Sequence, residues 1–310
     1  MGHTEKTLEE KWASLYLKED VSLSSLPVKG WQRIEAKVLD LVLEYTYRAS
    51  SKDYNRYYIN GVCIENVKGG LRGIATNGSH LALVDVPCKL TSFRASRLAT
   101  YGAEKYKKEI SHIIPLQYIS RLRQILKLSK TWDILIKNEY MALRQVGGSR
   151  VCQFSFVEGD FPNYQRVIPE ENNIMDTPFK MLQVDMPEVL DALKSFKKLP
   201  WYPKKRDDPW QIWFKVDSLT ELILSSVDPL PRSRETAAHE DKSLDIYTQA
   251  EPITEFMNGR HLEHVCASIK GTAQFEWQKD GKAWQIKPVV LDKELSKLLF
   301  VTMPLNKGCY

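Results

Sequence analysis

The stretch that decides the fold is VEGDFPNYQRVIP, residues 157–169, near the middle of the chain. It follows a run that predicts a strand from Val151 to Phe156, and its Gly, Pro and Asn residues end that strand. On both sides of it the sequence has the same rhythm, in which a helix, strands, a second helix and further strands follow one another. We interpret the stretch as the end of a first domain and the shared rhythm as an internal duplication.

The passage before this stretch predicts two amphipathic helices among strands. Apolar residues recur at helical spacing between Ile34 and Tyr45, and again from Leu116 to Lys130. The string IATNGSHLA, residues 74–82, predicts two strands joined by a tight Asn-Gly turn. Further strand-like runs lie at 57–64, 132–136, 141–145 and 151–156.

The passage after the stretch repeats this order. A helix is expected to begin with Pro187 in its first turn, and another over 258–269 with Asn258 as its N-cap. Strands are expected at 212–216, 222–226, 244–248, 273–277, 284–288 and 299–303, and an exposed charged loop at 229–242. The predicted class is α+β, with two helices packed on one side of antiparallel sheets in each domain. The predicted divisions are an N-terminal arm at 1–30 and domains at 31–170 and 171–310.

Length and composition agree with two globular domains. The chain has 310 residues, 43% of them hydrophobic and 27% charged, whereas single domains usually have ~100–150 residues. No window approaches the ~20 apolar residues of a membrane span. Six charged side chains between Met1 and Lys18 also exclude the apolar core of a signal peptide. We therefore expect a cytoplasmic protein.

The cysteines and histidines do not predict a metal site. The five cysteines are odd in number, widely spaced and never in a C-x-x-C pair, which argues against a disulfide framework and a zinc ribbon. His261 and His264 are better explained as a helix face than as metal ligands. We expect neither a metal nor a cofactor.

Charge is concentrated in one region. Residues 51–150 hold 17 Lys and Arg against 7 Asp and Glu, whereas residues 151–310 hold 20 against 24. Such a surplus suits a polyanion such as nucleic acid, although a solvated lysine-rich surface is the alternative explanation.

The motifs of common enzymes are absent from the sequence. It contains no phosphate-binding loop, no dinucleotide fingerprint, no H-E-x-x-H and no G-x-S-x-G elbow. Glu158 and Asp160 flank a glycine before a Phe-Pro turn, where a solvated loop is commoner than an acid/base pair. We predict a binding protein that is not an enzyme. An unrecognised nuclease or phosphotransferase is a distant alternative, because no clustered carboxylates support metal binding.

Five strings together resemble the beta sliding clamp family of bacterial DNA polymerase III. The family's middle domain has an A-T-D-G-H-R-L-A turn and ends with E-G-x-F-P-D-Y-x-R-V-[IL]-P, to which residues 74–82 and 157–169 are similar. RYYINGV at 56–62, FMN at 256–258 and VTMPL at 301–305 resemble later family segments in the same order. The resemblance covers residues 31–310, which correspond to the family's second and third domains.

This resemblance implies two tandem clamp domains and an assembly. A bacterial clamp subunit carries three such domains and closes a six-domain ring as a dimer. Three copies of a two-domain chain also supply six domains, since a head-to-tail interface closes when the rotation per subunit fits. We therefore expect a homotrimer in preference to a dimer.

The implied function is that of a DNA polymerase processivity factor that encircles double-stranded DNA. In the family, helical Lys and Arg side chains face the DNA phosphates without reading bases. Orientation toward bulk water is an equally good explanation for any single cation, and core packing for the tyrosines. The candidate DNA-binding residues are Arg33, Lys37, Arg56, Tyr57, Tyr58, Arg121, Arg123, Lys127, Lys194, Lys198 and Arg260.

The resemblance also implies a hydrophobic cleft for short linear peptides of DNA polymerase and clamp-loader subunits. Ser79-His80 replaces the family's His-Arg, so the peptide preference is expected to differ. Ordinary strand core is the alternative for Ile59, Leu81 and Val301. The candidate cleft residues are Ile59, Thr76, Gly78, His80, Leu81, Asn258, Val301, Met303, Pro304 and Leu305.

A second functional class stays open. The match begins only at the family's second domain, and residues 151–310 have a slightly acidic balance. Both features suit a clamp-like adaptor or regulator that binds partner peptides without encircling DNA.

Overall fold

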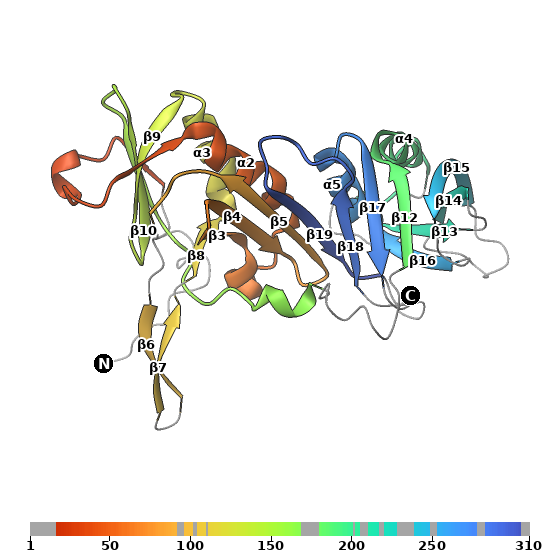
Figure 1. Cartoon of the computed structure of the whole chain (residues 1–310), viewed down its shortest axis with the longest axis horizontal. Helices are drawn as coiled ribbons and strands as arrows, with labels where there is room; N and C mark the ends of the chain where they lie inside the picture. The colour runs from red at the N-terminus through yellow and green to blue at the C-terminus, as the bar shows by residue number, and fades with distance from the viewer. Residues whose placement is uncertain are drawn as a thin grey trace. The chain divides into compact units, whose positions relative to one another are not determined.

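The computed structural model describes two compact units (Figure 1). The first unit runs to Asn163 and includes Lys293–Lys297; the second comprises Tyr164–Asp292 and the chain from Leu298 onward. No helix among the described residues is long and apolar enough to cross a membrane. The described residues are 17–91, 96–101, 104–109, 111–168, 180–200, 202–204, 210–216, 220–227, 239–248, 253–277 and 283–304.

The first unit contains the helix pair α2 (Ala36–Thr46) and α3 (Leu116–Leu126). Leucine and valine side chains of α2 are buried at helical spacing, and the helix packs on strands β4 and β5. The α3 helix ends before the expected Lys130, because the chain turns sharply there and the Leu128 N–H donates to the Ile125 carbonyl.

The strands of the first unit are all antiparallel where they pair. One sheet has the order β1-β11-β10-β9-β2, four further strands have the order β5-β4-β3-β8, and β6 pairs with β7 alone. Their bounds are β1 Lys18–Glu19, β2 Gln32–Glu35, β3 Gly61–Val67, β4 Gly70–Thr76, β5 His80–Pro87, β6 Ser96–Tyr101, β7 Glu104–Glu109, β8 His112–Pro115, β9 Thr131–Ile136, β10 Tyr140–Gln145 and β11 Val151–Ser155.

The sequence predicted that a strand begins at residue 57, and for residues 57–59 this prediction is wrong. They belong to the 3-10 helix η3 (Tyr54–Ile59), which Asp53 caps by accepting a hydrogen bond from the Asn55 N–H at 2.9 Å. Strand β3 begins at Gly61, where a Cβ would lie 2.3 Å from the Ile114 carbonyl oxygen of β8. The close approach of the two strands therefore requires glycine. Two shorter 3-10 helices, η1 (Leu23–Ser25) and η2 (Tyr47–Ala49), also lie in this unit.

The described part of the N-terminal segment packs on the first unit. Strand β1 pairs with β11, and Leu26 is buried with Leu135, Ala142 and Val151. The segment is red in Figure 1, beside the sheet that contains β9 and β10. The first 16 residues of the expected arm lie outside the described chain.

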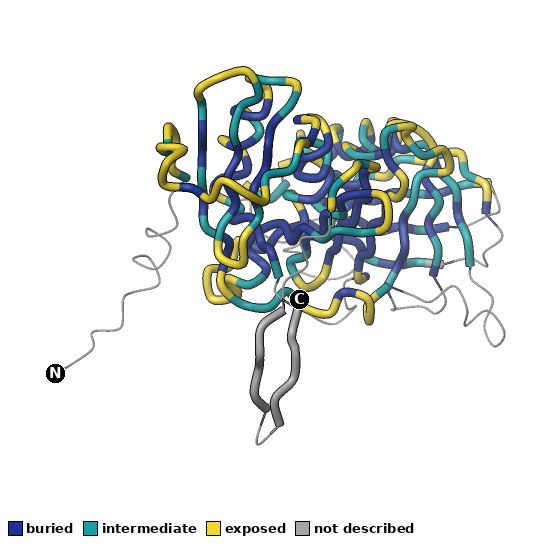
Figure 2. The backbone as a smooth tube through the Cα atoms, turned by 60° about the vertical axis from the view of Figure 1, so that its left-hand side comes forward, coloured by how far each residue is buried: buried dark blue, intermediate teal, exposed yellow. Residues whose placement is uncertain are grey.

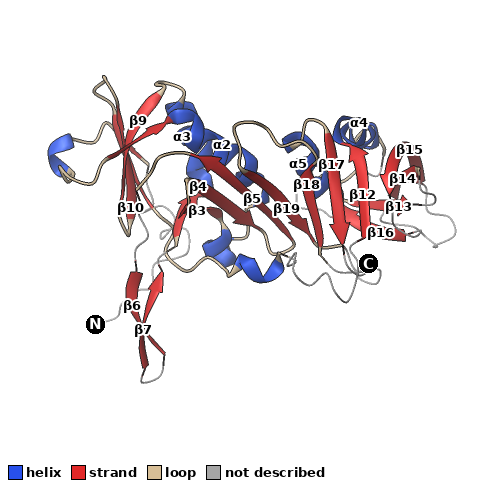
Figure 3. Cartoon of the chain, viewed as in Figure 1, coloured by secondary structure: helices blue, strands red, loops and turns tan. Residues whose placement is uncertain are grey.

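The second unit has the helix pair α4 (Met186–Phe196) and α5 (Gly259–Ser268), which pack against each other. Pro187 lies in the first turn of α4, as expected, and the 3-10 helix η4 spans Tyr164–Val167. Figure 3 shows one such helix pair in each unit. The predicted α+β class, with two helices and antiparallel sheets in each unit, is confirmed.

The strands of the second unit have the order β16-β13-β14-β15-β12-β17-β18-β19. Strand β15 begins at His239, inside the region predicted as an exposed loop, and β16 was not predicted; residues 228–238 are outside the described chain. The bounds are β12 Lys180–Asp185, β13 Gln211–Val216, β14 Glu221–Val227, β15 His239–Thr248, β16 Ile253–Asn258, β17 Thr272–Trp277, β18 Trp284–Pro288 and β19 Lys297–Thr302.

Aromatic rings fill the core of the second unit. Trp277 and Trp284 stack with ring centroids 4.2 Å apart, and Phe214 meets Trp284 edge-on at 5.4 Å. Buried residues alternate with more exposed ones along β13 and β17, whereas β5 and β8 are buried along almost their whole length; Figure 2 shows the buried backbone in dark blue. The core of each unit therefore lies between its sheets and its helix pair.

Candidate functional site

The candidate DNA-binding cation Arg123 connects the two helices of the first unit. Its Nε donates to Asp40 Oδ1 at 2.5 Å, and its Nη2 lies 3.3 Å from Glu44 Oε2. Burial opposes the charged guanidinium, but these carboxylates raise the pKa of Arg123. The side chain is only 23% exposed. Its charge is thus balanced within the unit, and its first role is to join α2 to α3.

Arg121 and Arg33 are more exposed, yet each has an acidic partner. Both Arg121 nitrogens Nε and Nη2 donate to the Glu19 carboxylate, at 2.7 and 2.9 Å. These hydrogen bonds lower the pKa of Glu19 and raise that of Arg121. Arg33 Nε donates to Asp133 Oδ1 at 3.0 Å, and Arg144 shares the same carboxylate. The surface around α3 is therefore a mixture of paired charges.

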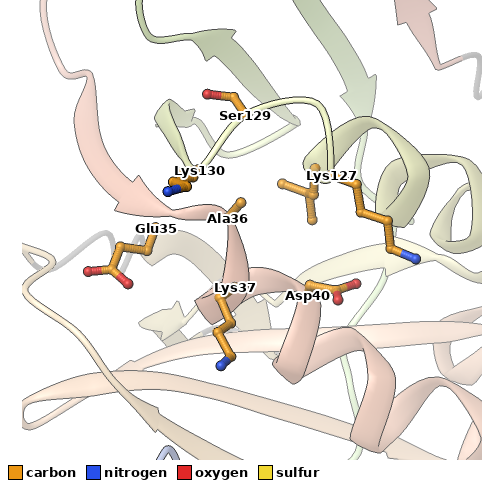
Figure 4. Close-up of a pocket in the computed structure, with 8 residues that line it drawn as sticks. Glu35, Ala36, Lys37, Asp40, Lys127, Ser129 and Lys130 are labelled. Carbon is orange, nitrogen blue, oxygen red and sulfur yellow. The ribbon is translucent and has the colours of Figure 1, made fainter.

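Two other candidates, Lys37 and Lys127, line one surface pocket of about 390 Å³ (Figure 4). Lys37 also forms an ion pair with Glu294. In Figure 4 the ammonium groups of Lys37, Lys127 and Lys130 point in different directions. The pocket therefore has a lining of mixed charge, and its ammonium groups do not converge on one point where an anion could bind. Its full lining is Glu35, Ala36, Lys37, Asp40, Leu126, Lys127, Ser129 and Lys130.

In the second unit, the candidates on the helices differ in exposure. Lys194 is exposed and paired with Asp191 at 2.8 Å, and Lys198 is exposed after the end of α4. The guanidinium carbon of Arg260 lies 6.0 Å from the centroid of the Tyr202 ring. Lys198 is thus the candidate of this unit that presents its charge most openly.

Helix α5 begins where it does because of a close approach. A Cβ at Gly259 would lie 2.5 Å from the Trp210 ring, and the Gly259 N–H donates to the Trp210 carbonyl at 2.7 Å. Asn258 is the predicted N-cap, and its Oδ1 accepts from the Arg260 N–H at 3.0 Å. Lys197 and Glu263 form an ion pair that links α4 to α5.

The candidates Arg56, Tyr57 and Tyr58 lie in η3, where two separate parts of the sequence meet. A Cβ at Gly78 would lie 3.0 Å from Arg56 Nη1, and one at Gly159 would lie 3.3 Å from Tyr57 Cε2. Both glycines have a positive φ, of 98° and 119°, which other residues rarely adopt. The strings 74–82 and 157–169 thus converge on η3, which their spacing in the sequence could not show.

The turn between β4 and β5 is held by side-chain hydrogen bonds. Thr76 Oγ1 donates to the His80 carbonyl at 2.8 Å, and Asn77 Oδ1 accepts from the backbone N–H groups of Ser79 and His80. Gly78 and Ser79 are exposed at its tip. The turn therefore has a fixed shape and a small polar surface.

Several candidate cleft residues are part of the core. Ile59 and Leu81 are each 3% exposed, and His80 and Val301 are also buried. Substitution of these side chains would disturb packing before it altered a contact surface. Sequence periodicity places such residues in strands but does not distinguish a covered face from a binding face.

The candidates of the second unit surround the end of β19. Thr302 Oγ1 lies 3.4 Å from Nδ1 of His261 in α5, which places the end of β19 beside the start of that helix. Met303 is 40% exposed, whereas Pro304 is buried; Leu305 lies outside the described residues. Met303 is thus the apolar candidate that a partner could touch directly.

From the sequence, His261 is explained as part of a helix face in preference to a metal ligand. Burial lowers its pKa to about 4, so its imidazole is neutral near pH 7. His261 follows the candidate Asn258 by three residues, a spacing that places both on the same side of α5. This spacing is the sequence signal that could have identified His261 as a neighbour of the candidate site. In the described chain, no group of three or more His, Cys, Asp or Glu residues could hold a metal ion.

The known proteins to which the chain is similar belong to one family. No family model matches the chain. The beta sliding clamp of Caulobacter vibrioides is 24% identical over 282 residues, which are 88% of this chain and 65% of that protein. The beta sliding clamp of Vibrio cholerae is 25% identical over 183 residues, 55% of this chain and 44% of that protein. The chain thus spans less than two thirds of the length of these relatives.

Solved structures of the same family share the fold. The Caulobacter crescentus beta sliding clamp aligns with a TM-score of 0.70 and 21% identity, covering 92% of this chain and 69% of that one. DNA polymerase III beta subunit from Thermotoga maritima aligns with a TM-score of 0.69 and 19% identity, covering 91% and 66%. A Bartonella birtlesii sliding clamp bound to griselimycin aligns with a TM-score of 0.67 and 21% identity, covering 91% and 68%. The chain is therefore a divergent relative of the bacterial beta sliding clamps of DNA polymerase III and has their fold.

Proposed function

We propose that this protein is a DNA sliding clamp, a cytoplasmic processivity factor that encircles duplex DNA and performs no chemistry. The observation that carries the proposal is the match to beta sliding clamps along 88% of the chain, together with two units of the same fold. We infer that copies of the chain assemble head to tail into a closed ring, with a trimer preferred over a dimer.

Charge supports weak, sequence-independent contact with the DNA backbone. Lys127 and Lys198 are exposed beside the helix pairs, one in each unit, and neither has an acidic partner within the described chain. Such cations interact with phosphates through space and do not read bases. A ring held by topology needs no stronger contact.

Tethering of replication proteins is the second part of the proposal. We infer that a short peptide of a DNA polymerase or clamp-loader subunit contacts Met303 beside the start of α5. A half-exposed thioether side chain repacks easily against different apolar anchors. The rigid turn at Gly78 offers a separate, polar contact in the first unit.

One observation favours a second candidate function. Arg121, Arg123 and Lys194 all have acidic partners, which reduces the charge available to DNA. A clamp-like adaptor that binds peptides without encircling DNA would not need that charge.

Mass measurement separates the two functions. Light scattering across a concentration series should approach three times the chain mass of 35.8 kDa at the highest concentrations. A mass that stays at one chain throughout the series would exclude the ring and favour the adaptor.

Retention on DNA tests encirclement directly. After action of a clamp loader, closed circular DNA should retain the protein in high salt, whereas linear DNA should release it from its ends. Lys127→Ala with Lys198→Ala should lower the salt dependence of loading, while Lys68→Ala with Lys89→Ala, two exposed lysines on strand connections, should leave it unchanged. Equal release from circles and linear fragments would contradict encirclement.

A further inference from the structure

The outer edge of β11 is covered by an N-terminal segment, residues 17–26, which we call the strap. Lys18 and Glu19 pair with Gln153 and Cys152, and the Val21 N–H donates to the Val151 carbonyl at 3.0 Å. On its other side β11 pairs with β10 over its whole length. Without the strap, β11 would be the exposed last strand of its sheet.

The two ends of the strap are held very differently. At its C-terminal end, Leu26 is buried among Leu135, Ala142 and Val151. At its N-terminal end, both residues of β1 are exposed, and Glu19 forms an ion pair with Arg121, whose side chain is 52% exposed. Val21, between the two ends, is partly buried against the same cluster as Leu26. Exposed ion pairs contribute little to stability. The Leu26 end is thus an anchor, and the β1 end is the part that can open.

The backbone also opposes the covered position. Asp20 has a φ of 61°, and it is the one residue other than glycine with a positive φ in the described chain. This left-handed conformation is unfavourable for residues with a side chain, although Asp tolerates it better than most. The strained residue lies between the ion pair and the Val21 hydrogen bond, where opening would release it.

We propose that the strap is a displaceable cap on the outer edge of β11, and that the strand that replaces it belongs to a second copy of this chain. Unpaired backbone groups on an edge strand are a template for another strand. The opposite end of the sheet is β2, a strand of four residues that leads directly into α2, so it offers a shorter edge than the five residues of β11. The covered edge is therefore the assembly surface of the first unit.

This inference rests on the proposed ring, in which each copy must offer an edge to its neighbour. If strap and neighbour compete for β11, assembly has to open the strap, and the apparent association constant falls in proportion to the open fraction. Loosening the strap then strengthens association, and tightening it weakens association. A strap that was merely part of the fold would give neither effect.

Three full-length variants test the competition. Glu19→Lys replaces the partner of Arg121 with a like charge, Asp20→Gly removes the left-handed penalty, and Asp191→Lys makes a matched charge reversal at an exposed ion pair of the second unit. Analytical ultracentrifugation gives the association constants, and hydrogen exchange at the Val21 amide reports strap opening independently.

We expect Glu19→Lys to raise the association constant ~3-fold, as for the loss of one exposed ion pair, and Asp20→Gly to lower it ~3-fold. Asp191→Lys should match the wild type. Equal association of all variants, with faster exchange at Val21 in Glu19→Lys, would overturn the strap inference and leave the ring proposal standing. Weaker association of Glu19→Lys would also overturn it, because the strap would then belong to the interface. Absence of association in every variant would overturn the ring proposal as well.

Discussion

The two units connect their helix pairs in the same way but with different side chains. In the first unit, Arg123 of α3 meets Asp40 of α2; in the second, Lys197 after α4 meets Glu263 of α5. Their aromatic cores also differ, since the second unit stacks Trp277 on Trp284, whereas in the first Phe154 packs against Tyr118 of α3 and lies edge-on to Phe156. One order of elements thus tolerates two packing solutions, because patterning and volume matter more than particular residues.

The surfaces of the two units have diverged as well. Residues 51–150 carry 17 basic against 7 acidic side chains, whereas residues 151–310 carry 20 against 24. The exposed apolar candidate, Met303, lies in the second unit. Within the proposed function, we infer that the first unit contributes more to contact with DNA and the second more to contact with peptides.

The aromatic core of the second unit should give the largest effect. Trp284→Ala removes a ring that contacts Trp277, Phe214 and Phe275, and should lower the free energy of unfolding by ~3–5 kcal/mol. Urea unfolding followed by tryptophan fluorescence measures it. A loss below ~1 kcal/mol would contradict the prediction that the stability of the second unit depends on its aromatic core.

In each unit, burial lowers the pKa of one histidine, and both of these histidines should destabilise the fold at mildly acidic pH. Burial lowers the pKa values of His112 and His261 to about 4, from an ordinary 6.5. The unfolded chain therefore binds more protons between these values, so stability is complete above pH 6.5 and falls as the pH decreases toward 4. Each histidine should contribute on the order of 2 kcal/mol to this loss.

The measurement is urea unfolding at pH 7.5 and at pH 4.5 for the wild type, His112→Gln and His261→Gln. Each variant should lose the pH dependence of its own unit and keep that of the other. A wild-type stability that does not change between the two pH values would contradict the prediction for both units.

The apolar part of the proposed peptide surface is expected to lie in the second unit. Met303→Ala should weaken binding of a peptide with Leu and Phe anchors by ~1–2 kcal/mol, since a few apolar contacts carry most of the energy of such a surface. Isothermal titration measures the affinity, and Tyr54→Ala, an exposed aromatic change in the first unit, is the control. Unchanged affinity in Met303→Ala would place the partner surface elsewhere.

The cross-helix ion pairs should give the smallest effects. Arg123→Ala leaves the partly buried Asp40 without its cation and should cost ~1–2 kcal/mol of unfolding free energy. Lys197→Ala breaks a more exposed pair and should cost ~0.5 kcal/mol. Denaturation of the two variants under one condition compares them. Equal losses would mean that the two units do not differ in how they hold their helices.

The sequence by itself determined those features that depend on neighbouring residues. Helical spacing predicted α2 and α3, and Asn258 was identified as an N-cap from its position before an apolar run. The strings at 74–82 and 157–169 identified the family. These signals are local, because helix period, capping and turns act over a few residues.

Only the tertiary structure decided which candidate side chains face a partner. In the sequence, Arg121 and Arg123 have no evident acidic partner. In the structure, Glu19, 102 residues away, pairs with Arg121, and Asp40, 83 residues away, pairs with Arg123. Leu81 was a candidate for the binding cleft, but its side chain is buried. Gly78 and Gly159 likewise each lie against the 3-10 helix at 54–59, the first beside Arg56 and the second beside Tyr57. Burial and ion pairing are properties of segments distant in sequence, so no local pattern contains them.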